Sequence, residues 1–168
     1  MEFAQVVVDA SRRLDAAPLG AAWQRAMHET LIALAAESIG GAARMLEMAT
    51  AYAREREQFG QPIGAFQAIA HYLADAATEI EGARWLVYQA AWAADTGRPF
   101  AQLALMAKLQ AGAVFRRATV TGVQIHGGLG FSLDADPQLY YRRAKHQQLM
   151  YWDPAHLEWR IAAGVFGA

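Results

Sequence analysis

The feature that most constrains the fold of this chain is a helical spacing of apolar residues that continues over three long stretches. In each stretch apolar side chains recur every three or four positions. A helix with this spacing has one apolar face, which is stable in water only when it packs against other helices. The three predicted helices cover residues 21–57, 66–96 and 100–122.

Two shorter helices are predicted near the C-terminus. Asp136-Pro137 and Asp153-Pro154 each combine an N-cap residue with proline at the first helical position. The predicted helices run to about Tyr151 and Val165. Short loops join all five segments, so we predict an all-α fold, an up-down bundle of three long and two shorter helices over residues 21–168.

The first predicted helix contains a pair of glycines, and the residues before it are the least helical part of the chain. Gly40 and Gly41 lie inside the first predicted helix, where such residues usually allow close helix contact. Residues 1–20 differ from the rest, because residues 4–8 form a β-branched run that could be a strand. A single strand cannot stand alone, so it would need a sheet from elsewhere. The alternative is a terminus without fixed structure.

Composition excludes several classes of function. The chain is 55% apolar and 18% charged with a net charge of −1, which argues against disorder and against a nucleic-acid-binding surface. It has no cysteine, and its five histidines lack metal-ligand spacing, so we expect no metal site. The start has no signal-peptide pattern, and the apolar stretch 100–115 is too short and too polar to cross a membrane. A cytoplasmic location is the expectation.

Two glycine-marked loops contain the candidate ligand-binding residues. Arg54 and Arg56 end the first helix beside a Gly/Pro loop at residues 58–64, and an arginine there is well placed to grip a phosphate. The alternative is that both arginines only complement the negative C-terminal end of the helix. In the second loop, residues 124–131, paired glycines allow a ligand to approach the backbone, although a simple inter-helix turn is the alternative.

Taken together, these segments resemble the C-terminal helical domain of the acyl-CoA dehydrogenase family. The resemblance covers residues 21–165 and rests on three motifs in order. They are Arg56-x-Gln58-Phe59-Gly60-x-Pro62-Ile63-Gly64-x-Phe66-Gln67, which continues to Leu73-Ala74-Asp75, then Gln124-Ile125-His126-Gly127-Gly128-Leu129-Gly130-Phe131, then Arg142-Arg143-Ala144-Lys145. Residues 4–20 resemble the tail of the family's preceding β domain.

The resemblance implies a shared FAD site. In the family, FAD lies between the middle domain of one subunit and the C-terminal bundle of its neighbour, so a homo- or hetero-oligomer, a dimer or tetramer, is expected. An acyl-CoA is the implied substrate. The implied cofactor-binding residues are Arg56 at the pyrophosphate, Phe59 and Gln67 in the same site, and Gln124, Gly127 and Gly128 at the ADP end.

The catalytic position departs from the family pattern. The family's reaction removes an α-proton from an acyl-CoA with a carboxylate, and the usual glutamate is replaced here by Tyr151. A tyrosine is a poor base because its ordinary pKa is near 10. Some members carry the base on the first long helix, at the position of Thr30, which makes the adjacent Glu29 a candidate. Asp153 is another candidate for the base, although an Asp-Pro pair is more typical of the N-cap of a helix. The alternative to an active dehydrogenase domain is a catalytically silent subunit or assembly domain.

Overall fold

The computed structural model describes residues 4–12 and 19–167, and within them it confirms the predicted all-α bundle. Two-residue strands and a 3₁₀ segment join the first long helix to the second, and a 3₁₀ segment follows the third; short turns make the other connections. The elements are the 3₁₀ helix η1 (Ala10–Arg12), α1 (Leu19–Glu55), β1 (Glu57–Gln58), β2 (Gln61–Pro62), η2 (Ile63–Ala65), α2 (Gln67–Asp95), α3 (Ala101–His126), η3 (Gly127–Phe131), α4 (Pro137–Leu149) and α5 (Pro154–Phe166).

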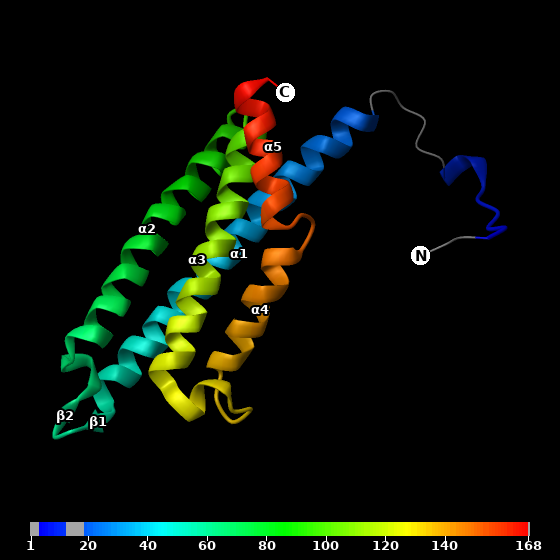
Figure 1. Ribbon diagram of the computed structural model, residues 1–168. Helices are drawn as coiled ribbons and strands as arrows, with labels where there is room; N and C mark the ends of the chain where they lie inside the picture. The colour runs from blue at the N-terminus through cyan, green and yellow to red at the C-terminus, as the bar shows by residue number, and fades with distance from the viewer. Residues whose placement is uncertain (1–3, 13–18, 168) are drawn as a thin grey trace.

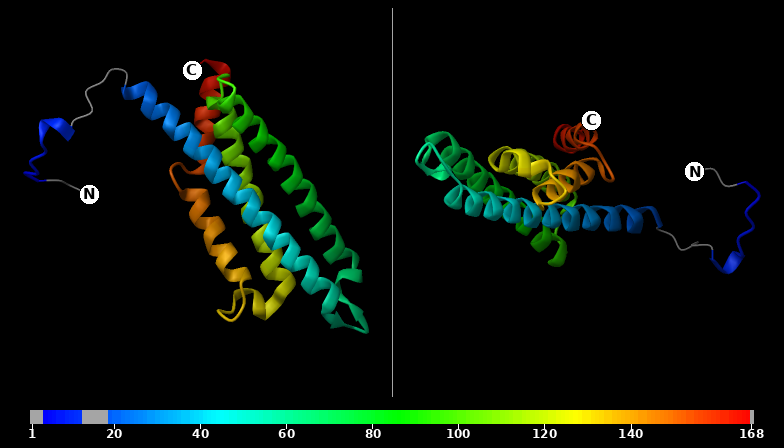
Figure 2. Two further views of the ribbon diagram at one scale, coloured as in Figure 1. Left: turned by 180° about the vertical axis from the view of Figure 1, so that it is seen from behind. Right: turned by 90° about the horizontal axis from the view of Figure 1, so that it is seen from below.

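The helices alternate in direction along the bundle (Figure 1). α1, α2 and α3 run antiparallel in turn, and α4 and α5 follow one another along α3, so that together they occupy the place of a fourth long helix. The turn between α4 and α5 therefore lies beside the first half of α3, where Lys108 is located. The first turns of α1 project beyond the other helices (Figure 2), and residues 19–26 are exposed there.

The core consists largely of alanine with a few large side chains, which lets the helices approach closely. Phe115 of α3 is 1% exposed and lies against Gly41 of α1, where an added Cβ would be 2.5 Å from the ring. Gly122 of α3 packs in the same way against Met45 of α1. Gly41 thus has the packing role predicted from the sequence. Gly40 does not, because a Cβ there would meet nothing within 4 Å.

Both glycine-marked loops are more regular than the sequence indicated. α1 ends at Glu55, two residues earlier than predicted, and an antiparallel pair of two-residue strands follows, with Gln58 opposite Gln61. α3 continues four residues past the predicted end at Gly122. Gly127 then stops it with a φ of +59°, a conformation that favours glycine.

One predicted N-cap is confirmed and the other is wrong. The Asp153 carboxylate accepts a hydrogen bond from the backbone N–H of His156 at 3.0 Å, at the start of α5. Asp136 precedes α4 with helical dihedral angles and makes no side-chain capping bond. Pro137 alone therefore provides the local start signal for α4.

The strand considered for residues 4–8 is not formed within the described residues. Residues 4–9 have neither helix nor strand, and the side chains of Val6, Val7 and Val8 are exposed. A strand requires a hydrogen-bonding neighbour, and the described part of this chain pairs none with them. The interpretation of residues 1–20 as the tail of a β domain stays a prediction, and residues 1–3 and 13–18 lie outside the described residues. None of the described helices is long and apolar enough to cross a membrane.

A buried histidine makes the stability of the bundle depend on pH. His28 is 8% exposed, and burial together with the positive charge of Arg160 lowers its pKa below the ordinary value. The unfolded chain therefore binds more protons than the folded chain below pH of about 6.5. We expect the free energy of unfolding in urea to fall as the pH drops from 7 to 5. The variant His28→Gln should flatten this dependence, whereas His71→Gln, at an exposed position, should leave it unchanged.

Candidate functional site

The two glycine-marked loops meet at one end of the bundle (Figure 1) and form a groove of about 580 Å³. One wall comes from the end of α1 and the strands that follow it, and the other from the end of α3 and η3. The lining residues are Tyr52, Arg56, Gln58, Ile63, Ile125, His126, Gly127, Gly128 and Leu129. The groove thus brings together segments about 70 residues apart in the sequence, as the motif pattern predicted.

Arg56 is held by its backbone while its guanidinium stays exposed. Its N–H donates to the Tyr52 carbonyl at 2.9 Å, and its own carbonyl accepts from the Ile63 N–H at 2.8 Å. These bonds tie the residue between α1 and the loop that follows. No carboxylate of the described residues lies within 4.0 Å of its guanidinium nitrogens. The planar cation can therefore meet an anion in the groove without breaking an internal ion pair.

An aromatic pair that sequence analysis missed joins the two walls. The rings of Tyr52 and His126 stack at 4.6 Å with an interplanar angle of 27°. The Nδ1 atom of His126 lies 2.7 Å from the Gly122 carbonyl oxygen, which orients the ring. The sequence contains one indication that Tyr52 belongs to the groove. It precedes Arg56 by four positions, a spacing that places two side chains on one face of a helix.

The second loop presents backbone to the groove. Gly127 and Gly128 are exposed, and a Cβ at either would meet nothing within 4 Å. Gly130 is buried instead, and a Cβ there would collide with the backbone carbonyl of Val123. The loop is thus anchored through Gly130 and open at Gly127 and Gly128, so a ligand can approach the exposed backbone.

This difference predicts the result of a matched pair of substitutions. Gly130→Ala should lower the free energy of unfolding by about 1–3 kcal/mol, because backbone cannot move aside as a flexible side chain can. Gly128→Ala adds the same methyl group in open space and should change stability by less than about 0.5 kcal/mol. Urea unfolding of both variants measures the contrast. Equal losses would show that the close approach of Gly130 to α3 does not hold the loop.

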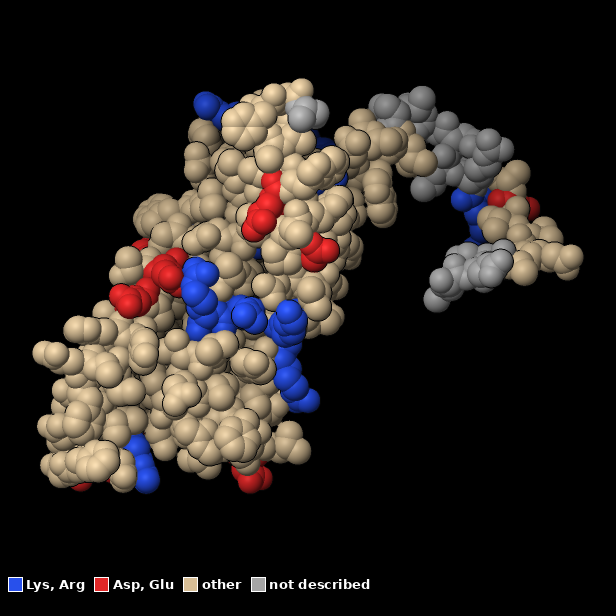
Figure 3. Space-filling model, in the orientation of Figure 1, with Lys and Arg blue, Asp and Glu red and all other residues tan. Residues whose placement is uncertain are grey.

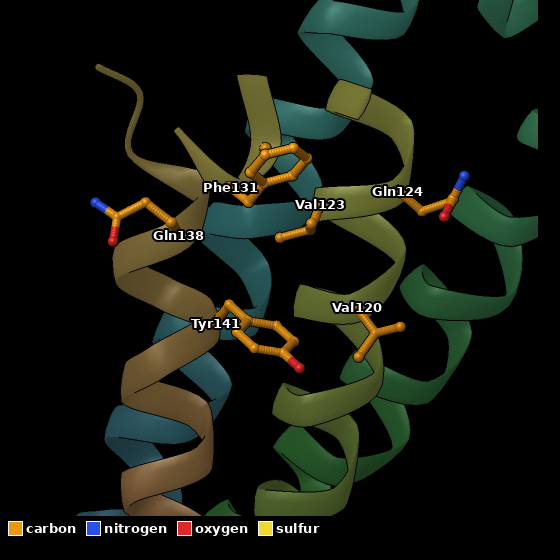
Figure 4. A pocket seen from close by; sticks show the side chains of 7 residues that line it. Val120, Val123, Gln124, Phe131, Gln138 and Tyr141 are labelled. Carbon is orange, nitrogen blue, oxygen red and sulfur yellow. The ribbon is translucent and has the colours of Figure 1, made fainter. Parts of the chain in front are cut away.

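The remaining residues implied for the cofactor lie near the groove but do not line it. Gln124 borders two neighbouring hollows, and in Figure 4 its side chain points away from Phe131 and Tyr141 toward α2. Phe59 is 93% exposed at the tip between the strands, with a φ of +54°. Gln67 is exposed at the first position of α2. These side chains are accessible to a molecule larger than the groove itself.

The charges that line the groove also suit an anionic ligand. The lining of the groove includes Arg56 and no carboxylate. On the face seen in Figure 3, basic side chains gather over α3 and α4, and the lower end, where the loops lie, is largely uncharged. Within residues 4–12 and 19–167 no group of three His, Asp or Glu side chains could hold a metal ion.

The comparison with protein families decides what kind of domain this is. The family described as acyl-CoA dehydrogenase, C-terminal domain, matches residues 20–151. The chain belongs to the acyl-CoA dehydrogenase family. It corresponds to the helical C-terminal domain of that family, and the match includes both walls of the groove.

Relatives of this acyl-CoA dehydrogenase domain are longer than the chain. The probable acyl-CoA dehydrogenase YngJ of Bacillus subtilis (strain 168) is 45% identical over 118 residues, 70% of this chain and 31% of YngJ. The ChsE4–ChsE5 complex of Mycobacterium tuberculosis matches with a TM-score of 0.86 and 30% identity, over 96% of this chain and 43% of that one. PigA with FAD and proline matches with a TM-score of 0.80 and 25% identity, over 83% and 37%. The chain thus spans less than half of these relatives.

The three candidates for the catalytic base of an acyl-CoA dehydrogenase lie apart from the groove. Glu29 is on α1, about 40 Å from Arg56 at 1.5 Å per residue, and its exposed carboxylate pairs with Arg25 at 2.8 Å. Asp153 accepts the N-cap bond of α5. Tyr151 lies between α4 and α5, 48% exposed, with a φ of +65°. The structure therefore brings Arg56, Gly127 and Gly128 together in the groove but does not bring the base candidates to it.

Proposed function

We propose that this domain supplies part of the FAD site of an acyl-CoA dehydrogenase-type flavoprotein. The groove between the two glycine-marked loops carries the proposal, since it combines one exposed arginine, accessible backbone and no lining carboxylate. An arginine fork suits a pyrophosphate because it donates two parallel charge-assisted hydrogen bonds. PigA, a structural relative, is described with FAD.

Within this proposal the chain's residues bind the cofactor rather than react with it. Arg56 would hold the pyrophosphate, and the backbone of Gly127 and Gly128 would face the ADP portion. Phe59, Gln67 and Gln124 are accessible beside the groove and would contact parts of the cofactor that extend beyond it. When bound, FAD supplies the hydride acceptor for α,β-dehydrogenation of an acyl-CoA thioester, the reaction proposed for the whole assembly.

The open groove also implies further protein around it. A groove of this size covers only part of a dinucleotide, so the rest of the site would come from other domains of the same assembly. The outer face of α2 suits contact with another subunit, because Trp85, Tyr88 and Trp92 are each more than half exposed on it. We propose a homo- or hetero-oligomer, as the ChsE4–ChsE5 complex illustrates for a relative.

The state of the three base candidates favours a second function, a catalytically silent subunit or assembly domain. Tyr151 replaces the expected carboxylate, the Asp153 carboxylate caps α5, and Glu29 is exposed and ion-paired. A general base needs a carboxylate that burial can tune toward the working pH. In this second function the domain would complete the FAD site while a partner subunit supplies the base.

Flavin uptake tests the first proposal. The chain is co-expressed with a polypeptide that carries the other domains of the family, and the purified assembly is examined for visible flavin absorption after incubation with FAD. Bound flavin is expected, and an assembly that never takes up FAD would rule out the cofactor role.

Acyl-CoA-dependent reduction of an electron acceptor then separates the two functions. If activity is present, Glu29→Gln tests the base, and an unchanged rate would remove Glu29 from consideration.

A further inference from the structure

Lys108 of α3 is a buried lysine that the cofactor site does not use. Its side chain is 3% exposed, although lysine is almost never fully buried without a partner. The Nζ atom donates to the carbonyl oxygens of Gln148 at 2.9 Å and Trp152 at 3.2 Å. Burial lowers the pKa of the Lys108 ammonium, and the negative charge of Asp153 acts in the opposite direction.

The two carbonyls lie on opposite sides of the turn between α4 and α5. Gln148 is in the last turn of α4, where carbonyls lack a partner within the helix. Trp152 precedes Asp153, the N-cap residue of α5. One ammonium therefore connects the end of one helix to the start of the next, and it does so from a third helix.

Tyr151 lies between these two anchored positions in a strained conformation. Its φ of +65° is unfavourable for a residue with a large side chain. The turn around it is fixed further by the Trp152 N–H, which donates to the Met150 carbonyl at 3.0 Å. The guanidinium of Arg160 lies 4.6 Å from the centre of the Trp152 ring, and that ring packs against the core. Tyr151 is nevertheless half exposed, so the constraint acts on its backbone.

We propose that Lys108 is a positioning residue that holds residues 150–153 in one conformation and so keeps the backbone of Tyr151 at positive φ with its side chain exposed. An apolar side chain of similar length would avoid the cost of burying an ammonium, but it could not bond both carbonyls.

Hydrogen exchange tests whether Lys108 fixes the turn between α4 and α5, and the test needs neither flavin nor acyl-CoA. In Lys108→Met, which keeps the length of the side chain and loses its donors, backbone amides from Met150 to His156 should exchange at least tenfold faster. Amides of α1 and α2 should keep their rates. Lys145→Met is the control, because Lys145 is exposed on α4 and bonds only the Gln148 side chain. Unchanged exchange in the turn, or acceleration spread evenly over the bundle, would overturn the proposal.

A coupling measurement distinguishes positioning from general packing. Tyr151→Gly relieves the strained φ and should raise the ratio of folded to unfolded protein roughly fivefold or more in the wild-type background. In the Lys108→Met background the turn is no longer held in this conformation, so Tyr151→Gly should change the ratio of folded to unfolded protein little. Equal effects in both backgrounds would overturn the positioning role, even if Lys108→Met is destabilised throughout.

Discussion

Gly41→Ala is expected to destabilise the bundle, whereas Gly40→Ala, one residue earlier, is expected to stabilise it. Both substitutions gain about 1 kcal/mol because alanine is the better helix former. At Gly41 the new methyl group would be 2.5 Å from the ring of Phe115, which is itself buried. Overpacking of this kind costs about 1–3 kcal/mol or occasionally more, and a core aromatic ring has little room to move.

The two variants should therefore differ by about 2–3 kcal/mol in the free energy of unfolding, or about 5–10 °C in Tm. Gly40 is exposed, and a Cβ there would meet nothing within 4 Å. Thermal unfolding of both proteins under the same conditions measures the difference. If both were stabilised, the close approach of α1 and α3 at Gly41 would be incorrect. The double variant Gly41→Ala with Phe115→Leu should recover part of the loss.

The helices could be predicted from the sequence because their signals are local. Apolar residues at a spacing of three and four positions define α1, α2 and α3, and proline marks the starts of α4 and α5. The predicted ends of the helices were less accurate, because tertiary contacts determine where a helix ends. α3 continues to His126, where the ring of His126 stacks on Tyr52 of α1. Nothing in the residues after Gly122 indicates that contact.

The candidate site was predictable in outline through its glycines and its arginine. Arg56, Gly127 and Gly128 share a groove, as the order of the motifs indicated. Lys108 could not have been found by the same reasoning. In the sequence it interrupts an apolar stretch, and only the position of the turn between α4 and α5 shows which carbonyls it reaches. Long-range partners of a single polar residue leave no periodic pattern to detect.

In the FAD-binding assembly, Arg56→Gln should weaken FAD binding on the order of 100-fold. The variant keeps a hydrogen-bond donor but loses the charge and the fork, and hydrogen bonds from a charged donor contribute about 1.5–3 kcal/mol each. Titration of the flavin-free assembly with FAD, followed by flavin fluorescence, gives the dissociation constant. The fold should be retained, because the bonds that anchor Arg56 involve its backbone alone.

Arg54→Gln is the matched control for this prediction. Arg54 lies in the last turn of α1, two residues before Arg56, and is exposed but does not line the groove. Both arginines could complement the negative end of the helix, and that effect is worth only about 0.3–1 kcal/mol. If helix complementation were their whole role, the two variants would lower the stability similarly and leave FAD binding intact. A large loss of affinity in Arg56→Gln, with a change of less than about threefold in Arg54→Gln, would assign the phosphate contact to Arg56, and equal losses would contradict it.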